Sequence, residues 1–470
     1  MGNQRNLVRT LGLGYVVIIV VANIIGSGIY KKIAPMAAEL NSPFWILCAW
    51  IAAGIITLFG ALSNAEIAGM LADTGGDFAY FKKIYNRFFA FIYGWSLFAV
   101  IQTATIASLA YVFAQSLNSI VPLPELFKEM NDFTIGGVFY PLQDFGIKLT
   151  AVLLILILTL LNISGLKSGA GLSRAIMLLV GAGLIIIVVF GLGNSIGKPS
   201  AYSGFLEMTA GTVTLSSFFT AMLAAFWAYQ GWISVGYIGG EVKDANRNIP
   251  RGIVIGVFIV IFIYLLVNFT YLTLLTIPDL VQIHEAGNQI AAVEAVRSFW
   301  GSAGVISMSI LILLTTAGCT NASILTGARP YYAMGRDKLF IPAMGTLNRN
   351  NVPSVSLLWQ GIWASVLVLS GTFDQLTDMI VFAVFIFYGA TSLGVFILRR
   401  RMPDVHRPYK VWGYPFVPAF YILFCIVLFF NTIITRPREA AIGLTLILAG
   451  IPVYFIMRRR NLKKGSLNDT

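Results

Sequence analysis

About twelve long apolar segments run through this chain of 470 residues, and no other feature constrains its fold as strongly. Roughly 20 apolar residues suffice for a helix to cross the ~30 Å hydrocarbon core of a bilayer. Only 11% of the residues are charged, against about 25% in soluble domains. The sequence therefore predicts an all-α membrane protein with 12 transmembrane helices, and it excludes a β-barrel, whose strands are short and alternating. The expected spans are 10–40, 44–71, 88–119, 147–164, 170–193, 214–241, 251–277, 302–332, 353–371, 376–398, 414–435 and 439–457.

Lys and Arg are distributed unevenly among the connections. The N-terminal tail, the connections after even-numbered spans and the C-terminal tail together hold 24 of the 32 Lys and Arg residues. By the positive-inside rule these parts face the cytoplasm. We therefore expect a multi-pass protein of the cell membrane with both termini cytoplasmic. The net charge of +12 then follows from topology, so it does not call for a nucleic acid partner.

The connections and the cysteines limit what else the chain contains. The longest polar connection, 120–146, is too short for a soluble domain, so we expect a single transmembrane domain over 1–470. Cys48, Cys319 and Cys425 all lie in apolar segments, which predicts no disulfide-linked partner subunit. The two histidines lie in connections, and no metal-ligand cluster or nucleophile–base set is evident. The sequence therefore implies no cofactor and argues against an enzyme.

The first apolar segment contains Gly26, Ser27 and Gly28 near its middle. Glycine is a poor helix former, and in lipid a broken backbone is tolerated only where protein or a polar ligand covers the freed groups. We interpret these residues as a break whose backbone binds a small charged ligand. The alternative interpretation is that small residues let another helix pack closely.

The sixth segment repeats this anomaly at residues 225–237, which read AFWAYQGWISVGY. The two segments are five spans apart, so a five-helix repeat would invert its own topology. Interrupted helices in corresponding positions of inverted halves indicate a transport site near the midplane. This predicts one repeat over about 10–193, a second over about 214–398, and two extra helices over about 414–457.

Helix direction predicts what the two breaks bind. The second half of helix 1 begins with free N–H groups, the positive end of a helix dipole, which suits a carboxylate. The first half of helix 6 ends near residues 226–230 with free carbonyls, which suit an ammonium group. Together they favour a zwitterion such as an α-amino acid. A substrate with a third charge is disfavoured, because that charge would be unpaired in the membrane.

Several motifs resemble the amino acid–polyamine–organocation superfamily, in particular its L-amino-acid-transporter branch. The similarity covers essentially the whole chain. It implies a leucine-transporter-like fold, with two inverted five-helix repeats plus two C-terminal helices and with helices 1 and 6 broken. The motifs are IIGSGIY (24–30), AEI (65–67), TGGD (74–77), LNISGLK (161–167), WAYQGW (227–232), GGE (239–241), NIP (248–250) and RPYYAMGRD (329–337).

The resemblance also implies roles for individual residues. It places the substrate carboxylate on the backbone N–H groups of Gly26, Ser27 and Gly28, with the Ser27 hydroxyl as a further donor. It places the amine against the carbonyls of Ile24, Trp227, Ala228 and Gln230. Trp227 occupies a gate position over the substrate; the alternative is an ordinary packed aromatic residue. Further candidates for the pocket lining are Phe226, Gln102, Thr103 and Ser234.

Two departures from the family pattern bear on coupling. Many members carry a helix-5 lysine near the break, where this chain has Val180, and some carry a helix-6 tyrosine, where it has Ser234. Sodium-coupled proteins of this fold bind Na⁺ between helix-1 carbonyls and helix-8 hydroxyls, and TTAGCTNA (315–322) resembles their helix-8 pattern. The corresponding candidate ligands for sodium are Ala22, Ile25, Ala317, Thr320 and Asn321. The alternative for Thr320 is a hydrogen bond to its own helix backbone.

The prediction is a secondary active transporter of a neutral L-amino acid that works by alternating access, with the lipid bilayer as its other partner. Three coupling modes stay open: sodium symport, obligatory exchange and proton symport. An amino acid sensor with a transporter fold is a more distant alternative. A channel would need a continuous polar lining, which the sequence does not show.

Overall fold

The computed structural model describes residues 9–71, 75–130, 133–135, 139–196, 213–286, 289–370 and 373–463. Within these ranges the chain is helical apart from short connections and two isolated β-bridges. The all-α prediction is therefore confirmed. Thr74 of the TGGD motif and both extreme ends of the chain lie outside the described residues.

The helices follow one another with short connections. In chain order they are α1 (Leu13–Ile24), α2 (Gly28–Lys31), α3 (Ile33–Leu40), α4 (Pro43–Leu71), α5 (Asp77–Ile84), α6 (Arg87–Ser96), η1 (Leu97–Ile101), α7 (Gln102–Asn118), η2 (Lys128–Met130), α8 (Phe145–Ser164), α9 (Leu166–Ser195), α11 (Leu215–Tyr229), η3 (Trp232–Tyr237), η4 (Gly239–Glu241), α12 (Ala245–Leu274), α13 (Ile277–Ala286), α14 (Ala291–Arg336), η5 (Pro342–Gly345), α15 (Ser354–Ser370), α16 (Phe373–Arg401), α17 (Phe416–Thr435), α18 (Pro437–Leu448) and α19 (Gly450–Lys463).

Nine helices in the described ranges are long and apolar enough to cross a membrane, and α1 and α15 are shorter apolar helices. Each of the twelve predicted spans coincides with one helix or with consecutive helices. The predicted span 10–40 is divided into α1, α2 and α3, and the span 214–241 into α11, η3 and η4. The two segments predicted to be broken are therefore both interrupted. The inverted-repeat relation between the two halves stays a prediction.

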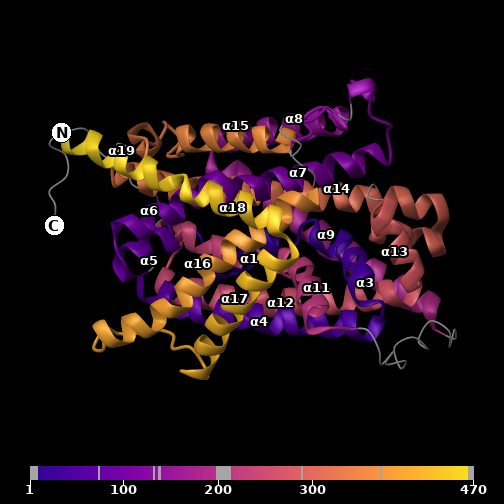
Figure 1. Cartoon of the computed structure of the whole chain (residues 1–470), viewed down its shortest axis with the longest axis horizontal. Coiled ribbons are helices and arrows are strands. Elements are labelled where there is room, and N and C mark those ends of the chain that lie inside the picture. The colour runs from indigo at the N-terminus through magenta and orange to yellow at the C-terminus, as the bar shows by residue number, and fades with distance from the viewer. Residues whose placement is uncertain are drawn as a thin grey trace.

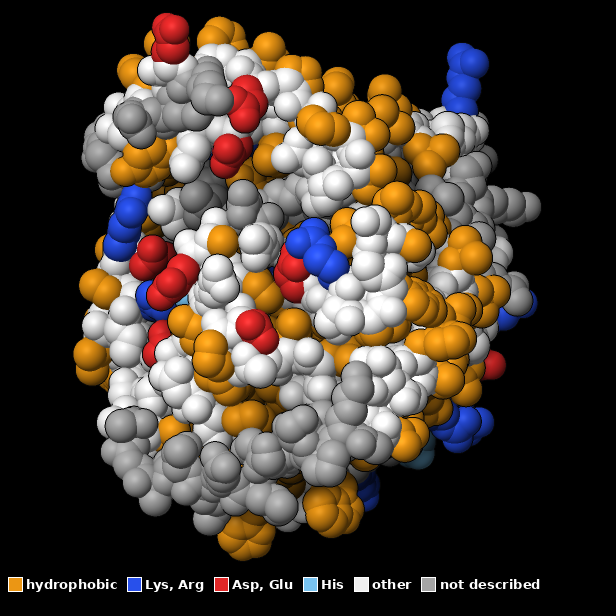
Figure 2. Space-filling model, turned by 90° about the vertical axis from the view of Figure 1, so that its right-hand side faces the viewer, with side chains coloured by type: hydrophobic (Ala, Val, Ile, Leu, Met, Phe, Trp, Pro, Cys, Tyr) orange, Lys and Arg blue, Asp and Glu red, His pale blue; other side chains and the backbone are white. Residues whose placement is uncertain are grey.

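Helix α1 lies inside the bundle, where α12, α14 and η3 pack against it (Figure 1). Its residues from Ile19 to Ile24 are all buried, as expected for a helix surrounded on every side. By contrast, Ile157 and Leu160 of α8 are both 63% exposed, as suits a helix that faces lipid. Apolar side chains also cover much of the right-hand flank of the molecule in Figure 2.

The two ends of the molecule differ in the helices that form them. In Figure 1, α5 and the last turns of α19 lie at the left-hand end, whereas α3 and α13 lie at the right-hand end. The left-hand end carries the Arg-rich end of α16 and the connection that follows it. By the positive-inside rule this is the proposed cytoplasmic end.

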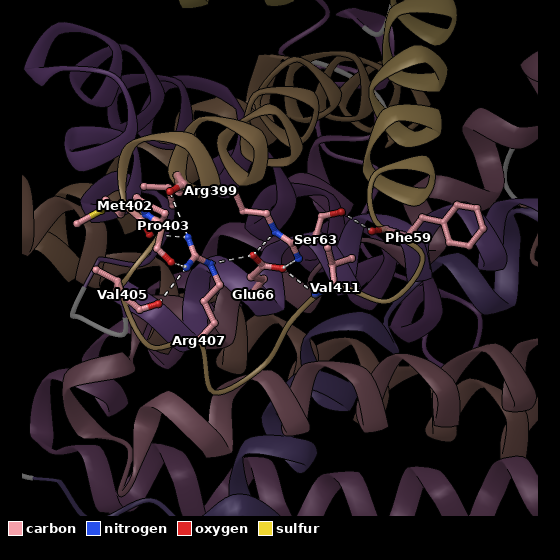
Figure 3. Close-up of polar contacts among 10 residues, drawn as sticks. Phe59, Ser63, Glu66, Arg399, Met402, Pro403, Val405, Arg407 and Val411 are labelled. Carbon is pink, nitrogen blue, oxygen red and sulfur yellow. Dashed lines mark hydrogen bonds and ion pairs between the residues drawn. The ribbon is translucent and has the colours of Figure 1, made fainter.

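At the proposed cytoplasmic end, the buried carboxylate of Glu66 binds several groups from the connection between α16 and α17 (Figure 3). Glu66 of α4 accepts hydrogen bonds from Arg399 Nε at 2.9 Å and Nη2 at 2.7 Å, and from the Val411 backbone N–H at 2.7 Å. Arg407 Nε lies 3.4 Å from Glu66 Oε1, and its guanidinium donates to the carbonyls of Leu398, Met402, Pro403 and Val405. The connection from α16 to α17 is thereby held against α4.

Candidate substrate site

Helix 1 is interrupted between Ile24, the last residue of α1, and Gly28, the first residue of α2. Ile25 has an extended backbone with φ −72° and ψ 96°, and its N–H still bonds the Val21 carbonyl at 2.8 Å. In the described part of the chain, the N–H groups of Gly26, Ser27 and Gly28 make no backbone hydrogen bond. The start of α2 therefore presents amide donors, as the direction of helix 1 predicts.

Helix 6 is interrupted directly opposite. Helix α11 ends at Tyr229, Gln230 is extended with φ −71° and ψ 153°, and Gly231 follows with φ 117°, a region that favours glycine. A Cβ on Gly231 would lie 2.3 Å from the Asn23 carbonyl oxygen, and one on Gly28 would lie 2.5 Å from Ala228 Cα. Glycine is needed at both positions because the two broken backbones touch.

Tyr264 of α12 joins the two breaks. Its hydroxyl lies 2.9 Å from the Ile24 carbonyl and 2.9 Å from the Ala228 carbonyl, and it also interacts with the Gly26 backbone N–H. The side chain is fully buried between Trp50 and Tyr229, whose rings it contacts. The carbonyls freed by both breaks thus converge on one polar atom.

A cavity of about 30 Å³ lies between the breaks. This volume has room for roughly two water molecules, so an amino acid fits only after the walls move. Trp227 Nε1 donates to Ser27 Oγ at 3.3 Å across the cavity. The lining includes Gly26, Ser27 and Gly28 from helix 1 and Trp227, Gln230 and Ser234 from helix 6.

A known protein family matches almost the whole chain. The profile of the family described as "Amino acid permease" matches residues 11–457. The chain belongs to the amino acid permease family. It is a multi-pass membrane transporter and not an enzyme.

Several characterised relatives align with almost the whole permease. It is 29% identical to the serine/threonine exchanger SteT of Bacillus subtilis, an alignment covering 97% of this chain and 98% of SteT. It is also 29% identical to the large neutral amino acids transporter small subunit 2 of Mus musculus, over 100% of this chain and 84% of that protein. The human b(0,+)-type amino acid transporter 1 is 26% identical, over 96% of this chain and 88% of its own length.

The predicted pocket residues of the permease separate into two groups. Ile24, Gln102 and Ser234 line the cavity together with the residues named above. Ala228 does not line it, but its carbonyl bonds Tyr264. Phe226 and Thr103 are not among its described lining residues: the Phe226 ring packs on Phe385 and Phe424, and the Thr103 hydroxyl bonds the Phe98 carbonyl.

The five candidate sodium ligands, which are Ala22, Ile25, Ala317, Thr320 and Asn321, are not part of the described cavity lining. The Thr320 hydroxyl donates to the Thr316 carbonyl at 2.6 Å, the alternative that the sequence left open. Asn321 Oδ1 accepts from Asn162 Nδ2 of α8 at 2.7 Å. Both side chains therefore make hydrogen bonds within the bundle.

Sequence reasoning missed several lining residues. Cys319 and Ser323, four residues apart on α14, share one face that meets helix 1, and Tyr237 and Tyr388 also line the cavity. A helical spacing of four would have indicated the first pair. Gln102 directly follows the π-helical turn η1, a feature often found at functional sites, and its amide donates to the Ser323 carbonyl at 2.9 Å.

On its proposed outer side, the cavity is covered by α11, by α16 and by the junction between α2 and α3. The Trp227 ring meets Phe373 edge-on, at 6.1 Å between ring centroids. Just beyond, Lys32 Nζ lies 2.8 Å from Asp374 Oδ1 and 2.9 Å from Thr377 Oγ1. Lys32 is 2% exposed, whereas the Asp374 side chain is 59% exposed, so the pair joins a buried ammonium group to a carboxylate at the surface. The Trp227 ring and Phe373 therefore lie between the cavity and this ion pair.

Proposed function

We propose that the permease exchanges neutral α-amino acids across the membrane by alternating access, binding each one as a zwitterion between the two breaks. One observation carries the proposal: the amide donors of Gly26–Gly28 line one cavity together with Ile24, Trp227 and Gln230, and the Ala228 carbonyl lies behind this lining on the Tyr264 hydroxyl. The donors suit a carboxylate, with the Ser27 hydroxyl as an additional donor. The carbonyls, with those of Trp227 and Gln230, suit an ammonium group.

The charges around the cavity support a neutral substrate. None of its described lining residues is Asp, Glu, Lys or Arg. A third charge on the substrate would be buried without a partner, at a cost of several kcal/mol. Gln102, Thr105 and Ser323 lie along the lining, so a substrate with a hydroxyl or amide side chain would find partners there.

Exchange is favoured over sodium symport for two reasons. SteT, which aligns over nearly the full length, is named as an exchanger. The Asn321 side-chain oxygen, proposed as a sodium ligand, already accepts a hydrogen bond from Asn162, which makes it a poorer member of the set of oxygen ligands that a hard cation needs. The Thr320 hydroxyl donates to the Thr316 carbonyl, so its oxygen can still accept.

The proposed function includes a membrane topology for the two repeats and the termini. The repeats 10–193 and 214–398 are related by inversion, and both termini face the cytoplasm. Support comes from the interrupted helices at corresponding positions and from the basic residues around Glu66 at one end. No disulfide-linked subunit is proposed.

Uptake of labelled neutral amino acids into proteoliposomes tests the proposal. We expect rapid uptake only when the lumen holds unlabelled neutral amino acid, with no dependence on a Na⁺ gradient. Uptake that requires Na⁺ and is lost in Thr320→Val would replace exchange with sodium symport. Binding without any transport would support a sensor and refute the proposed function.

A further inference from the structure

Asp77 is a buried carboxyl group for which the transport scheme gives no role. It is the first residue of α5, in the connection between the spans Pro43–Leu71 and Arg87–Asn118, and it is 0% exposed. The preceding Gly75 donates its N–H to the Tyr237 carbonyl at 3.0 Å. A Cβ on Gly76 would lie 2.7 Å from the Tyr237 ring. Asp77 is therefore fixed against η3, the inner half of helix 6.

The partners of this carboxyl are all neutral. Asp77 Oδ1 accepts from Asn64 Nδ2 of α4 at 3.1 Å and from Thr391 Oγ1 of α16 at 2.9 Å. Asp77 Oδ2 is buried and has no hydrogen-bond partner in the described part of the chain. An ionised carboxylate in this position is costly, because neither oxygen meets a cation.

The ion pairs on the surrounding helices do not include Asp77. On α5 itself, Lys82 lies 2.5 Å from Asp337. On α4 and α16, Glu66 and Arg399 bond each other at 2.7 Å. Arg87 of α6 and Arg401 of α16 donate to the backbone carbonyls of Asp337 and Ile84. In the described part of the chain, no cation is hydrogen-bonded to Asp77.

Three tyrosines face Asp77 from three other elements. The phenol groups of Tyr93 in α6, Tyr237 in η3 and Tyr388 in α16 all interact electrostatically with the carboxyl. The hydroxyls of Tyr93 and Tyr237 lie 2.9 Å apart. On its own helix, Tyr80 is also buried. Because Tyr237 and Tyr388 line the substrate cavity, the carboxyl and the cavity share two residues.

Burial determines how this group titrates. It raises the pKa of the Asp77 carboxyl to about 7, while the hydrogen bonds from Thr391 and Asn64 lower the pKa by less. The group therefore changes its charge near neutral pH, in a place where the charged form needs water that the closed packing excludes.

We propose that Asp77 is a proton-binding site that controls opening of the proposed cytoplasmic end: the protonated carboxyl stabilises the packing of the segment Gly75–Asp77 on η3, and the carboxylate favours an opened, hydrated arrangement. This inference rests on the proposed transport cycle, in which the inner half of helix 6 moves. The proton binds from and returns to the same aqueous side. One cycle therefore moves no net proton, and the proton acts as a regulator of exchange.

Exchange measured at equal pH on both sides tests the proposal. For one group that titrates near pH 7, the ionised fraction, and with it the exchange rate, rises roughly tenfold between pH about 6 and about 8. Asp77→Asn mimics the protonated form, so its rate is pH-independent and no higher than the wild-type rate at low pH. Asp404→Asn removes an exposed carboxylate from the connection between α16 and α17, at the same end, and keeps the wild-type profile.

Thr391→Val is a second variant, for which we expect the pH midpoint of exchange to shift in one direction. It removes a hydrogen bond that stabilises the carboxylate, so the midpoint of the pH profile moves to higher pH. An unchanged midpoint contradicts the proposal even if Asp77→Asn does not fold.

Infrared titration of purified permease tests the site without transport. We expect a protonated-carboxyl C=O band that disappears as pH rises through about 7 in the wild type and is absent from Asp77→Asn. If this band is present but the permease shows no amino acid exchange, Asp77 is a proton-binding site and the proposed exchange function is wrong. The proposal is overturned if no carboxyl titrates there, if Asp77→Asn keeps the wild-type pH profile, or if a pH gradient alone drives amino acid accumulation.

Discussion

Single residues make two broken helices tolerable inside a membrane. Backbone groups freed in the bilayer core require partners, and Tyr264 meets this need for the carbonyls of Ile24 and Ala228. Gly28 and Gly231 permit the contact, because any side chain there would collide with the opposite helix. At this scale, the site is a set of backbone atoms held in place by a few side chains.

Replacing Tyr264 by Phe removes the hydroxyl that both carbonyls share. We expect a loss of about 1–3 kcal/mol in unfolding free energy, because two buried acceptors lose their donor. Thermal unfolding in detergent measures the change. Tyr271→Phe is the matched control on α12, since the Tyr271 hydroxyl is equally buried but has no hydrogen-bond partner in the described chain. Equal loss in the two variants would contradict the bridging role.

The sequence allowed part of this site to be predicted. Gly26 and Gly28 indicated the first break, because glycines in mid-span signal an interrupted helix. The bridge by Tyr264 could not be predicted, since it lies 240 residues from Ile24 and nothing local marks its hydroxyl. Asp77 stood within a recognised motif, but its burial depends on α4, α6, η3 and α16, which only the fold brings together.

At the scale of elements, the contact between the two broken helices sets the geometry of the cavity. Helix 1 was predicted to break and resume, and α1 and α2 confirm an interruption there. The short tight helix η3 after Gly231 was not predicted, because residues 232–237 read as ordinary apolar helix. Its packing against α1, α12 and α14 explains the difference, since tertiary contacts outweigh local helix propensity.

Gly28→Ala tests whether this contact matters for transport. The added Cβ would meet Ala228 Cα at 2.5 Å, so we expect the helices to separate and exchange to fall at least about tenfold, the effect of ~1.4 kcal/mol. Gly14→Ala on α1 is the control, because a Cβ there has nothing within 4 Å. The contact would be irrelevant to transport if both variants exchanged amino acids at the wild-type rate.

At the scale of the whole molecule, each end has a buried charge that is paired with a charged partner. Lys32 is buried beside the exposed Asp374 at the proposed outer end, and Glu66 is buried beside Arg399 and Arg407 at the other. Losing the partner of a buried charge is costly. Such groups favour two discrete packings over a continuous deformation, which is what alternating access requires.

Asp77 makes the stability of the whole permease depend on pH. Its pKa is raised from the ordinary value of 3.8 to about 7, so the folded protein holds this proton more tightly than the unfolded chain does. The resulting stabilisation is complete below pH about 4 and is lost as pH rises to about 7. We expect the wild-type melting temperature to fall by several degrees across this window relative to Asp77→Asn. Parallel curves for the two proteins would show that Asp77 does not titrate on unfolding.

The central claim is that peptide groups at two helix breaks bind the two charges of one zwitterion. Competition by substrate analogues tests it most directly, using a neutral amino acid, its methyl ester and its N-acetyl derivative against labelled amino acid bound to purified permease. The account predicts that the ester and the N-acetyl derivative each bind at least about 100-fold more weakly, because each leaves one set of buried peptide groups unpaired, at ~2.7 kcal/mol or more. Equal competition by all three compounds would contradict it.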